Sequence, residues 1–282
     1  MSKEKKKKSS SFTTWLLVLL MLAGLSLLLY PTVANWWNTL YLTREVKSYS
    51  DSVAKMDTSE LDEMWNEAVN YNKELFSPNQ RLAAISDEQL ERYNNTLNVT
   101  ASGIMGYVEI PRIRVELPIY HGTGDEILQF AIGHLDATTL PVGGINTHCV
   151  ISGHRGLPSA RLFTDIDQLV EGDTFILQVL GRTMTYEVDQ IRVVLPTELA
   201  NLEIEENMDY CTLVTCTPYG VNSHRLLVRG RRTDNAADEI YVPADATQIR
   251  PIYIAPIIGI PILFGLLIYV LIFTGKRRKR NK

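Results

Sequence analysis

The sequence YCTLVTC at residues 210–216 is the most informative stretch for the fold. It is rich in β-forming residues and stops at TPYG, residues 217–220, which favour a turn. Because side chains alternate along a strand, Cys216 shares a face with Thr212 and Val214. A thiol at the last position of a strand is held by a rigid element and stays open to a ligand. Cys216 is therefore a candidate nucleophile.

A second predicted strand follows at residues 225–229, RLLVR, and could pair with the first so that Arg225 lies near Cys216. A guanidinium there can stabilise a thiolate and donate hydrogen bonds to the oxygen of a tetrahedral acyl intermediate. Lysine lacks the planar fork and would do this less well. The alternative is a buried cysteine beside a solvated edge arginine, and strand geometry alone leaves it open.

A thiol nucleophile needs an acid/base partner, normally histidine, to protonate the leaving amine. We favour His154, which lies in SGHRG at residues 152–156, because a strand end flanked by glycines lets the ring project into a cleft. Four other histidines compete for the role: His121, His134, His148 and His224.

The other two cysteines, Cys149 and Cys211, are too few for a disulfide framework and are either two core thiols or one disulfide. His148 precedes Cys149 directly, but neighbours on a strand point to opposite faces, so they form no dyad. No His, Cys or carboxylate cluster has metal-ligand spacing. We expect neither a metal nor a cofactor.

Short runs rich in Val, Ile, Tyr and Thr, separated by Gly and Pro, extend on both sides of this site and predict a mainly β domain over residues 103–233, a barrel or a sandwich. Residues 45–75 carry apolar side chains at three- and four-residue steps, which predicts an amphipathic helix that restarts near Ser59. Ser86 and Gln89 form a capping box that opens a short helix ending near Asn95.

Positive charge gathers at the two ends of the 282-residue chain. Of 28 Lys and Arg residues, five lie in the first eight positions and six in the last seven, which leaves 17 against 31 acidic residues between them, a net charge of −14. An interior this acidic is a poor surface for nucleic acid. We therefore expect no nucleic-acid partner.

Two apolar stretches adjoin the basic ends and predict transmembrane helices at residues 12–34 and 251–275. The positive-inside rule then places the basic segments 1–11 and 276–282 in the cytoplasm and the catalytic domain outside the cell. The alternative for the first stretch is a signal peptide cleaved near Thr32-Val33-Ala34, although the apolar run is long for one. Residues 234–250 are predicted to be a linker.

These residues resemble the sortases, and within them the class C, pilin-polymerising group of Gram-positive bacteria. The TLVTC run at 212–216 is similar to the family's TLxTC signature, Arg225 stands at the spacing of its arginine, and SGHRG at 152–156 is similar to the segment that carries its histidine. The segments GYVEIP at 106–111 and LPIYHGT at 117–123 are also typical. The resemblance implies a closed sortase-type β-barrel with an N-terminal helical extension, flanked by two transmembrane helices.

The resemblance also implies a reaction. Cys216 would cleave an LPxTG-like sorting signal of a pilin between Thr and Gly, His154 would act as general acid/base, Arg225 would stabilise the oxyanion, and Thr215 would contact the substrate. A lysine of another pilin subunit would then accept the acyl group in an isopeptide bond. A housekeeping sortase that anchors proteins to a peptidoglycan precursor, and a non-catalytic scaffold that binds sorting signals, are the alternatives.

Residues 35–102 are expected to form a helical stalk and the region equivalent to a lid. Many class C relatives hold a lid over the cysteine with an Asp-Pro-aromatic triplet. The corresponding residues 76–85 contain Ser77-Pro78-Asn79 and no such triplet. We therefore expect a more open cleft.

Overall fold

The computed structural model describes residues 11–75 and 85–235, together with Gly265. Residues 34–237 form one compact unit, and the preceding part of the chain belongs to a second unit. The residues that correspond to a lid, 76–84, lie outside the described residues, so the expected open cleft stays a prediction. The linker beyond residue 235 lies outside them as well.

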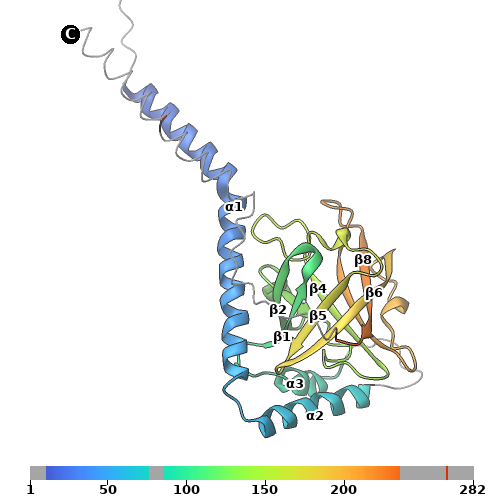
Figure 1. Ribbon diagram of the computed structural model, residues 1–282. Helices are drawn as coiled ribbons and strands as arrows, with labels where there is room; N and C mark the ends of the chain where they lie inside the picture. The colour runs from blue at the N-terminus through green and yellow to red at the C-terminus, as the bar shows by residue number, and fades with distance from the viewer. Residues whose placement is uncertain (1–10, 76–84, 236–264, 266–282) are drawn as a thin grey trace, which may run out of the picture. The chain divides into compact units, whose positions relative to one another are not determined.

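Eight strands close into a barrel in the order β1-β2-β3-β4-β7-β8-β6-β5 (Figure 1). Their bounds are β1 Ile104–Ile110, β2 Val115–His121, β3 Ile132–His134, β4 Thr147–Gly153, β5 Thr174–Val179, β6 Arg182–Val194, β7 Asp209–Thr217 and β8 His224–Thr233. The pairs β2–β3 and β4–β7 are parallel and the others are antiparallel. The barrel closes where β1 pairs with β5, with Val108 opposite Leu177. The predicted closed β-barrel is confirmed.

Alternation along the strands separates the barrel interior from its outer wall. In β7, Cys211 and Leu213 belong to the main hydrophobic core. Val214, one residue on, belongs instead to a small second cluster with Val150 and Leu227. The 3-10 helix η3 (Ala200–Leu202) adds Leu202 to this outer cluster. Burying apolar surface on both sides of β7 makes this strand a rigid support for its end.

The helix α1 (Ser11–Val53) packs its last turns against the barrel. Leu42, Val46 and Tyr49 are at most 4% exposed and join the main core. The Tyr49 hydroxyl donates to the Met105 carbonyl (3.1 Å) and accepts from the Leu180 amide (2.9 Å). The three- to four-residue periodicity therefore identified a real packing face.

The helices α2 (Thr58–Leu75) and α3 (Asp87–Asn95) lie across one end of the barrel (Figure 1). The predicted restart near Ser59 comes one residue earlier, because the Leu61 amide already donates to the Asp57 carbonyl. The predicted capping box is confirmed in α3: Gln89 N donates to Ser86 Oγ, and Ser86 N donates to Gln89 Oε1. Three short helices complete the described set: α4 (Asp125–Leu128) and the 3-10 helices η1 (Pro111–Ile113) and η2 (Ile166–Gln168).

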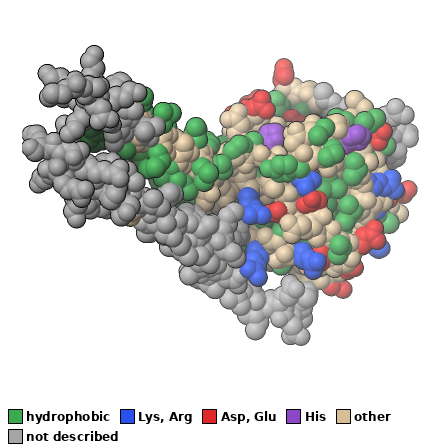
Figure 2. Space-filling view, turned by 90° about the horizontal axis from the view of Figure 1, so that it is seen from above, with side chains coloured by type: hydrophobic (Ala, Val, Ile, Leu, Met, Phe, Trp, Pro, Cys, Tyr) green, Lys and Arg blue, Asp and Glu red, His purple; other side chains and the backbone are tan. Residues whose placement is uncertain are grey.

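One described helix is long and apolar enough to cross a membrane, over Val18–Val53 with a mean hydropathy of 1.8 in its most apolar window, and none of that window is buried. Leu19, Leu20 and Leu27 are among its exposed side chains. Apolar side chains gather on this helix, whereas Lys, Arg, Asp and Glu are interspersed on the visible face of the barrel (Figure 2). The second expected span, 251–275, lies almost wholly outside the described residues and stays a prediction.

Two facing carboxyl groups give the barrel a pH-dependent stability. Glu109 in β1 stands opposite Glu116 in β2. Burial, followed by the charge of Glu116, raises the pKa of Glu109 to about 7 from its ordinary value of 4.5. Between these two pH values, Glu109 keeps its proton in the folded state but loses it in the unfolded state. The free energy of unfolding therefore falls as the pH rises through this range.

We expect Glu109→Gln to remove this pH-dependent loss of stability, because glutamine carries no titratable proton. The free energy of unfolding should rise by about 1 kcal/mol at pH 8, a value that allows for solvent screening, and should change little at pH 4.5. Thermal unfolding of the full chain at both pH values measures the effect. The exposed Glu187, also on a barrel strand, supplies the control variant Glu187→Gln. An equal gain at both pH values would contradict the assignment.

Candidate active site

The candidate nucleophile lies at the end of β7 on the outer wall of the barrel. Thr212 and Val214 precede it on the same face and are 1% and 8% exposed, whereas Cys216 is only half-buried. The strand is thus anchored by buried side chains until the position where the thiol becomes accessible. Its sulfur forms no hydrogen bond with the described part of the chain, which leaves it uncommitted.

The adjacent strand β8 places Arg225 directly opposite Cys216. Facing residues of antiparallel strands project from the same side of the sheet, so the guanidinium and the thiol share the outer wall. Arg225 Nη1 donates to the carbonyl oxygens of His224 (3.1 Å) and Asn222 (3.3 Å), which holds the side chain over the β7–β8 turn. The remaining N–H groups of the guanidinium are available to an oxyanion.

On the other side of β7, the parallel strand β4 brings His154 to the same level. Ser152 pairs with Val214 in the last register pair, and two residues further along each strand stand His154 and Cys216. The Thr215 hydroxyl donates to the Gly153 carbonyl (2.7 Å), so the two strands stay joined at this level. His154 is half-buried and makes no side-chain hydrogen bond with the described residues.

A glycine is required immediately before His154. A Cβ at Gly153 would lie 2.8 Å from atoms of both Ile132 and Phe163. The chain can therefore turn tightly over the buried Phe163 ring only if position 153 carries no side chain. This packing fixes where the histidine leaves the strand.

Three of the other four histidines are buried or half-buried and held by hydrogen bonds, and the fourth, His224, lies near the site. Both ring nitrogens of His121 lie 2.8 Å from carbonyl oxygens, and burial lowers its pKa. His134 is fully buried against the Tyr93 hydroxyl (3.0 Å). His148 contacts Thr212 Oγ1 (2.7 Å), and burial lowers its pKa to about 4. His224 lies opposite Thr217, one residue from Arg225, and contacts Ser223 Oγ (2.9 Å).

The remaining cysteines are two free core thiols, not a disulfide. Cys149 in β4 pairs in register with Cys211 in β7, and both belong to the interior core. Burial raises the pKa of Cys211 well above its ordinary value. Neither thiol competes with Cys216 as a nucleophile, because both sulfurs are enclosed in the core, where a peptide cannot reach them.

Thr215 lies next to Cys216 on the opposite face of β7. Its side chain is only 2% exposed, and its expected contact with substrate stays a prediction. Its hydroxyl ties β7 to the end of β4. Strand alternation in the sequence already predicts this orientation, because the neighbour of an outward-facing Cys216 must face inward.

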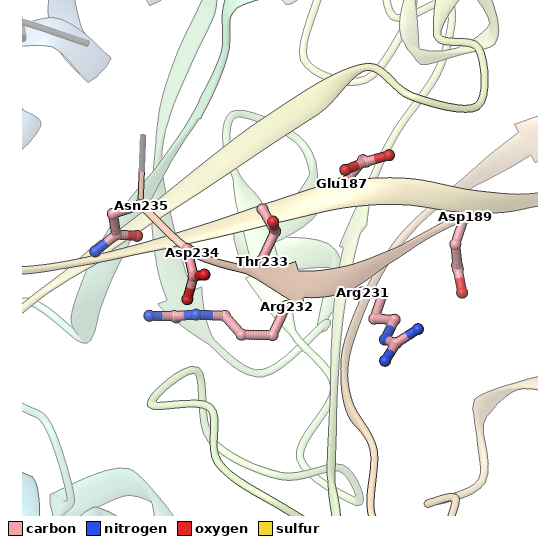
Figure 3. Close-up of a pocket in the computed structure, with 7 residues that line it drawn as sticks. All are labelled: Glu187, Asp189, Arg231, Arg232, Thr233, Asp234 and Asn235. Carbon is pink, nitrogen blue, oxygen red and sulfur yellow. The ribbon is translucent and has the colours of Figure 1, made fainter. Parts of the chain in front are cut away.

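A charged groove of about 630 Å³ lies away from these residues, at the opposite end of β8 (Figure 3). It is lined by Glu187, Asp189, Arg231, Arg232, Thr233, Asp234 and Asn235. None of the three candidate catalytic residues contributes to it. Among the described residues, no group of three or more His, Cys, Asp or Glu side chains could hold a metal ion.

A model of the sortase domain matches residues 108–233. The crystal structure of sortase C1 from Streptococcus agalactiae is 48% identical, and the similarity covers 68% of this chain and 100% of that one with a TM-score of 0.67. The chain belongs to the sortase family. Members of this family are cysteine transpeptidases.

Further comparisons confirm the resemblance to class C sortases. The sortase C structures from Streptococcus pneumoniae and Clostridium perfringens are 43% and 41% identical, with TM-scores of 0.61 and 0.60, and cover 69% and 68% of this chain and 98% and 100% of their own. Sortase D of Bacillus subtilis strain 168 is 30% identical over 135 residues, 47% of this chain. The match spans 64% of that curated relative, just under two thirds of its length.

Proposed function

We propose that this sortase is a membrane-anchored transpeptidase that cleaves an LPxTG-like sorting signal between Thr and Gly and joins pilin subunits through a lysine isopeptide bond. The observation that carries the proposal is the register of β4, β7 and β8, which brings His154, Cys216 and Arg225 to one level of the outer wall. Two structural relatives support the choice of substrate: the structure of the pneumococcal enzyme bears on pilin substrate specificity, and that of the Clostridium perfringens enzyme includes the C-terminal cell wall sorting motif.

In the first half-reaction, the Cys216 thiol gives its proton to the His154 imidazole, and its sulfur attacks the threonine carbonyl carbon and forms a tetrahedral intermediate. The Arg225 guanidinium donates hydrogen bonds to its oxyanion. The C–N bond then breaks, His154 gives a proton to the departing glycine amine, and a thioester with threonine remains.

In the second half-reaction, the lysine amine of another pilin subunit attacks the thioester carbonyl. His154 takes up the proton from that amine, the C–S bond breaks, and an amide forms between the threonine carbonyl and the lysine side chain. His154 passes this proton to the departing sulfur, so the thiol and the imidazole return to their starting protonation states. No cofactor is needed, because the acyl group passes between two amines at similar energy.

The proposal places the enzyme at the bacterial membrane with two spans and the catalytic domain outside the cell. The apolar helix at Val18–Val53 supports the first anchor. Fixing the enzyme in the plane that also holds unprocessed pilins would raise their effective concentration at the site.

The proposed reaction is tested with the full chain in detergent and a purified pilin subunit that carries an LPxTG-like signal. We expect covalent ladders, and mass spectrometry should find a Thr–Lys isopeptide bond in them. Release of a monomer ending in a free threonine carboxylate, or transfer only to a peptidoglycan-precursor amine supplied in parallel, would overturn the pilin assignment in favour of wall anchoring.

The proposed oxyanion donor makes a separate prediction. We expect Arg225→Lys to lower kcat by about 10²-fold, because an ammonium group cannot reproduce the planar fork of donors. Single-turnover cleavage of a sorting-signal peptide measures the change. Arg231→Lys, an exposed position on the same strand, is the matched control. Equal activity of the two variants would contradict the role of Arg225.

A further inference from the structure

Two segments that carry the candidate catalytic residues touch each other through Arg155 and Tyr219. Arg155 follows His154, and its guanidinium forms an ion pair with Asp167. Arg155 Nη1 lies 3.5 Å from Thr217 Oγ1, the residue after Cys216. The guanidinium carbon also lies 5.9 Å from the centroid of the Tyr219 ring, within the range of a cation–π contact.

The Tyr219 ring packs against the backbone of the histidine segment. A Cβ at Gly156 would lie 3.0 Å from Tyr219 Cε2, and Gly156 has a φ of +77°, which favours glycine. Tyr219 is 62% exposed, so core burial does not hold this ring in place. Its contacts with Arg155 and Gly156 do.

Arg155 is unusually enclosed for an arginine beside a surface cleft. Its side chain is 11% exposed, whereas its partner Asp167 is 41% exposed. Its Nε atom is buried and has no hydrogen-bond partner among the described residues. An unpaired buried donor costs free energy, so stability alone does not explain an arginine at this position.

We propose that Arg155 is a positioning residue that holds His154 at working distance from Cys216. The inference rests on the proposed function of this site. The Thr215–Gly153 hydrogen bond joins β7 and β4 on the interior side of the wall, and Arg155 joins the same two segments just beyond, through Thr217 and Tyr219. Without Arg155, the two segments would still be joined through Thr215 and Gly153, but they would lose the contacts just beyond this point that hold the imidazole near the thiol.

The side-chain chemistry explains why arginine serves here. One planar guanidinium contacts a carboxylate, a hydroxyl and an aromatic face at once, because its five donors lie in the plane and its faces stay free to stack. A lysine ammonium can keep the contact with Asp167 and Tyr219 but cannot also reach Thr217. Arg155→Lys should therefore retain part of the function.

The test compares Arg155→Ala with Arg161→Ala in the full-length protein. Arg161 is the matched control, because it also forms an ion pair with an aspartate, Asp165, from the same connection after β4 but does not reach the β7–β8 turn. We expect Arg155→Ala to lower kcat for sorting-signal cleavage at least tenfold with KM within twofold, Arg155→Lys to recover part of kcat, and Arg161→Ala to leave both constants unchanged. An equal effect of the two alanine variants, or a loss confined to KM, would overturn the proposal.

Hydrogen exchange and thiol alkylation keep the test independent of the proposed reaction. Arg155→Ala should speed amide exchange in residues 154–163 and 217–223, and should shift the pH profile of Cys216 alkylation by iodoacetamide, located by mass spectrometry. If Arg155 and Tyr219 act through their shared contact, the double variant Arg155→Ala/Tyr219→Ala should lose no more kcat than the more damaging of the two single variants. Absence of cleavage by the wild type would count against the proposed function, whereas unchanged exchange and alkylation would count against the role of Arg155.

Discussion

Replacing Cys216 with alanine will abolish transpeptidation while the protein stays folded. The variant cannot form the thioester, so we expect turnover to fall by about 10³-fold or more. The thiol is half-buried at a strand end, and its removal leaves little cavity, so the melting temperature should move by less than about 2 °C. Ladder formation with purified pilin and thermal unfolding of the same sample measure the two effects.

The interior thiol Cys211 provides the reverse control. It is fully buried, so Cys211→Ala should cost about 1–2 kcal/mol of stability while kcat per folded molecule stays at the wild-type value. If Cys216→Ala retained thioester formation with a sorting-signal peptide, or if Cys211→Ala removed it without unfolding, the assignment of the nucleophile would be wrong.

Replacing His154 with alanine should produce the second-largest loss. Without an imidazole the glycine amine must depart unprotonated, so we expect kcat to fall by about 10²- to 10⁴-fold. The acylation burst with a sorting-signal peptide isolates this step.

His224 tests whether the position of the imidazole matters. It adjoins Arg225 in sequence and faces Thr217 across the strand pair, so it is the other histidine near the site. His224→Ala should leave kcat within threefold of the wild type. A larger loss in His224→Ala than in His154→Ala would reverse the two assignments.

Strand patterning predicted much of the candidate site. The alternation of residues 210–216 correctly placed Cys216 on the face of Thr212 and Val214, and the return of the chain at Arg225 correctly indicated the pairing of β7 with β8. Both inferences depend on local geometry, which the sequence encodes directly. The choice of His154 rested on a strand end flanked by glycines, and the parallel register with β7 supports it.

Long-range contacts lay beyond that reasoning. Closure of the barrel through β1 and β5 joins segments about seventy residues apart, and only the family resemblance indicated it. The two hydrogen bonds between the Asn72 amide and Leu140, at 2.7 and 3.1 Å, leave no periodic trace in the sequence. The contact of Arg155 with Tyr219 likewise depends on how two loops meet, which spacing does not specify.

Strand β7 is buried on both faces of the barrel wall until its last residues. Cys211 and Leu213 pack into the main core, whereas Thr212 and Val214 are buried on the outer side and only Cys216 becomes accessible. Substitutions at positions 211–214 should therefore change stability, whereas substitution of Cys216 should change reactivity. Loss of a single residue from the middle of the strand would exchange the two faces and turn the sulfur into the interior, so this segment should accept substitutions far more readily than frame-preserving deletions.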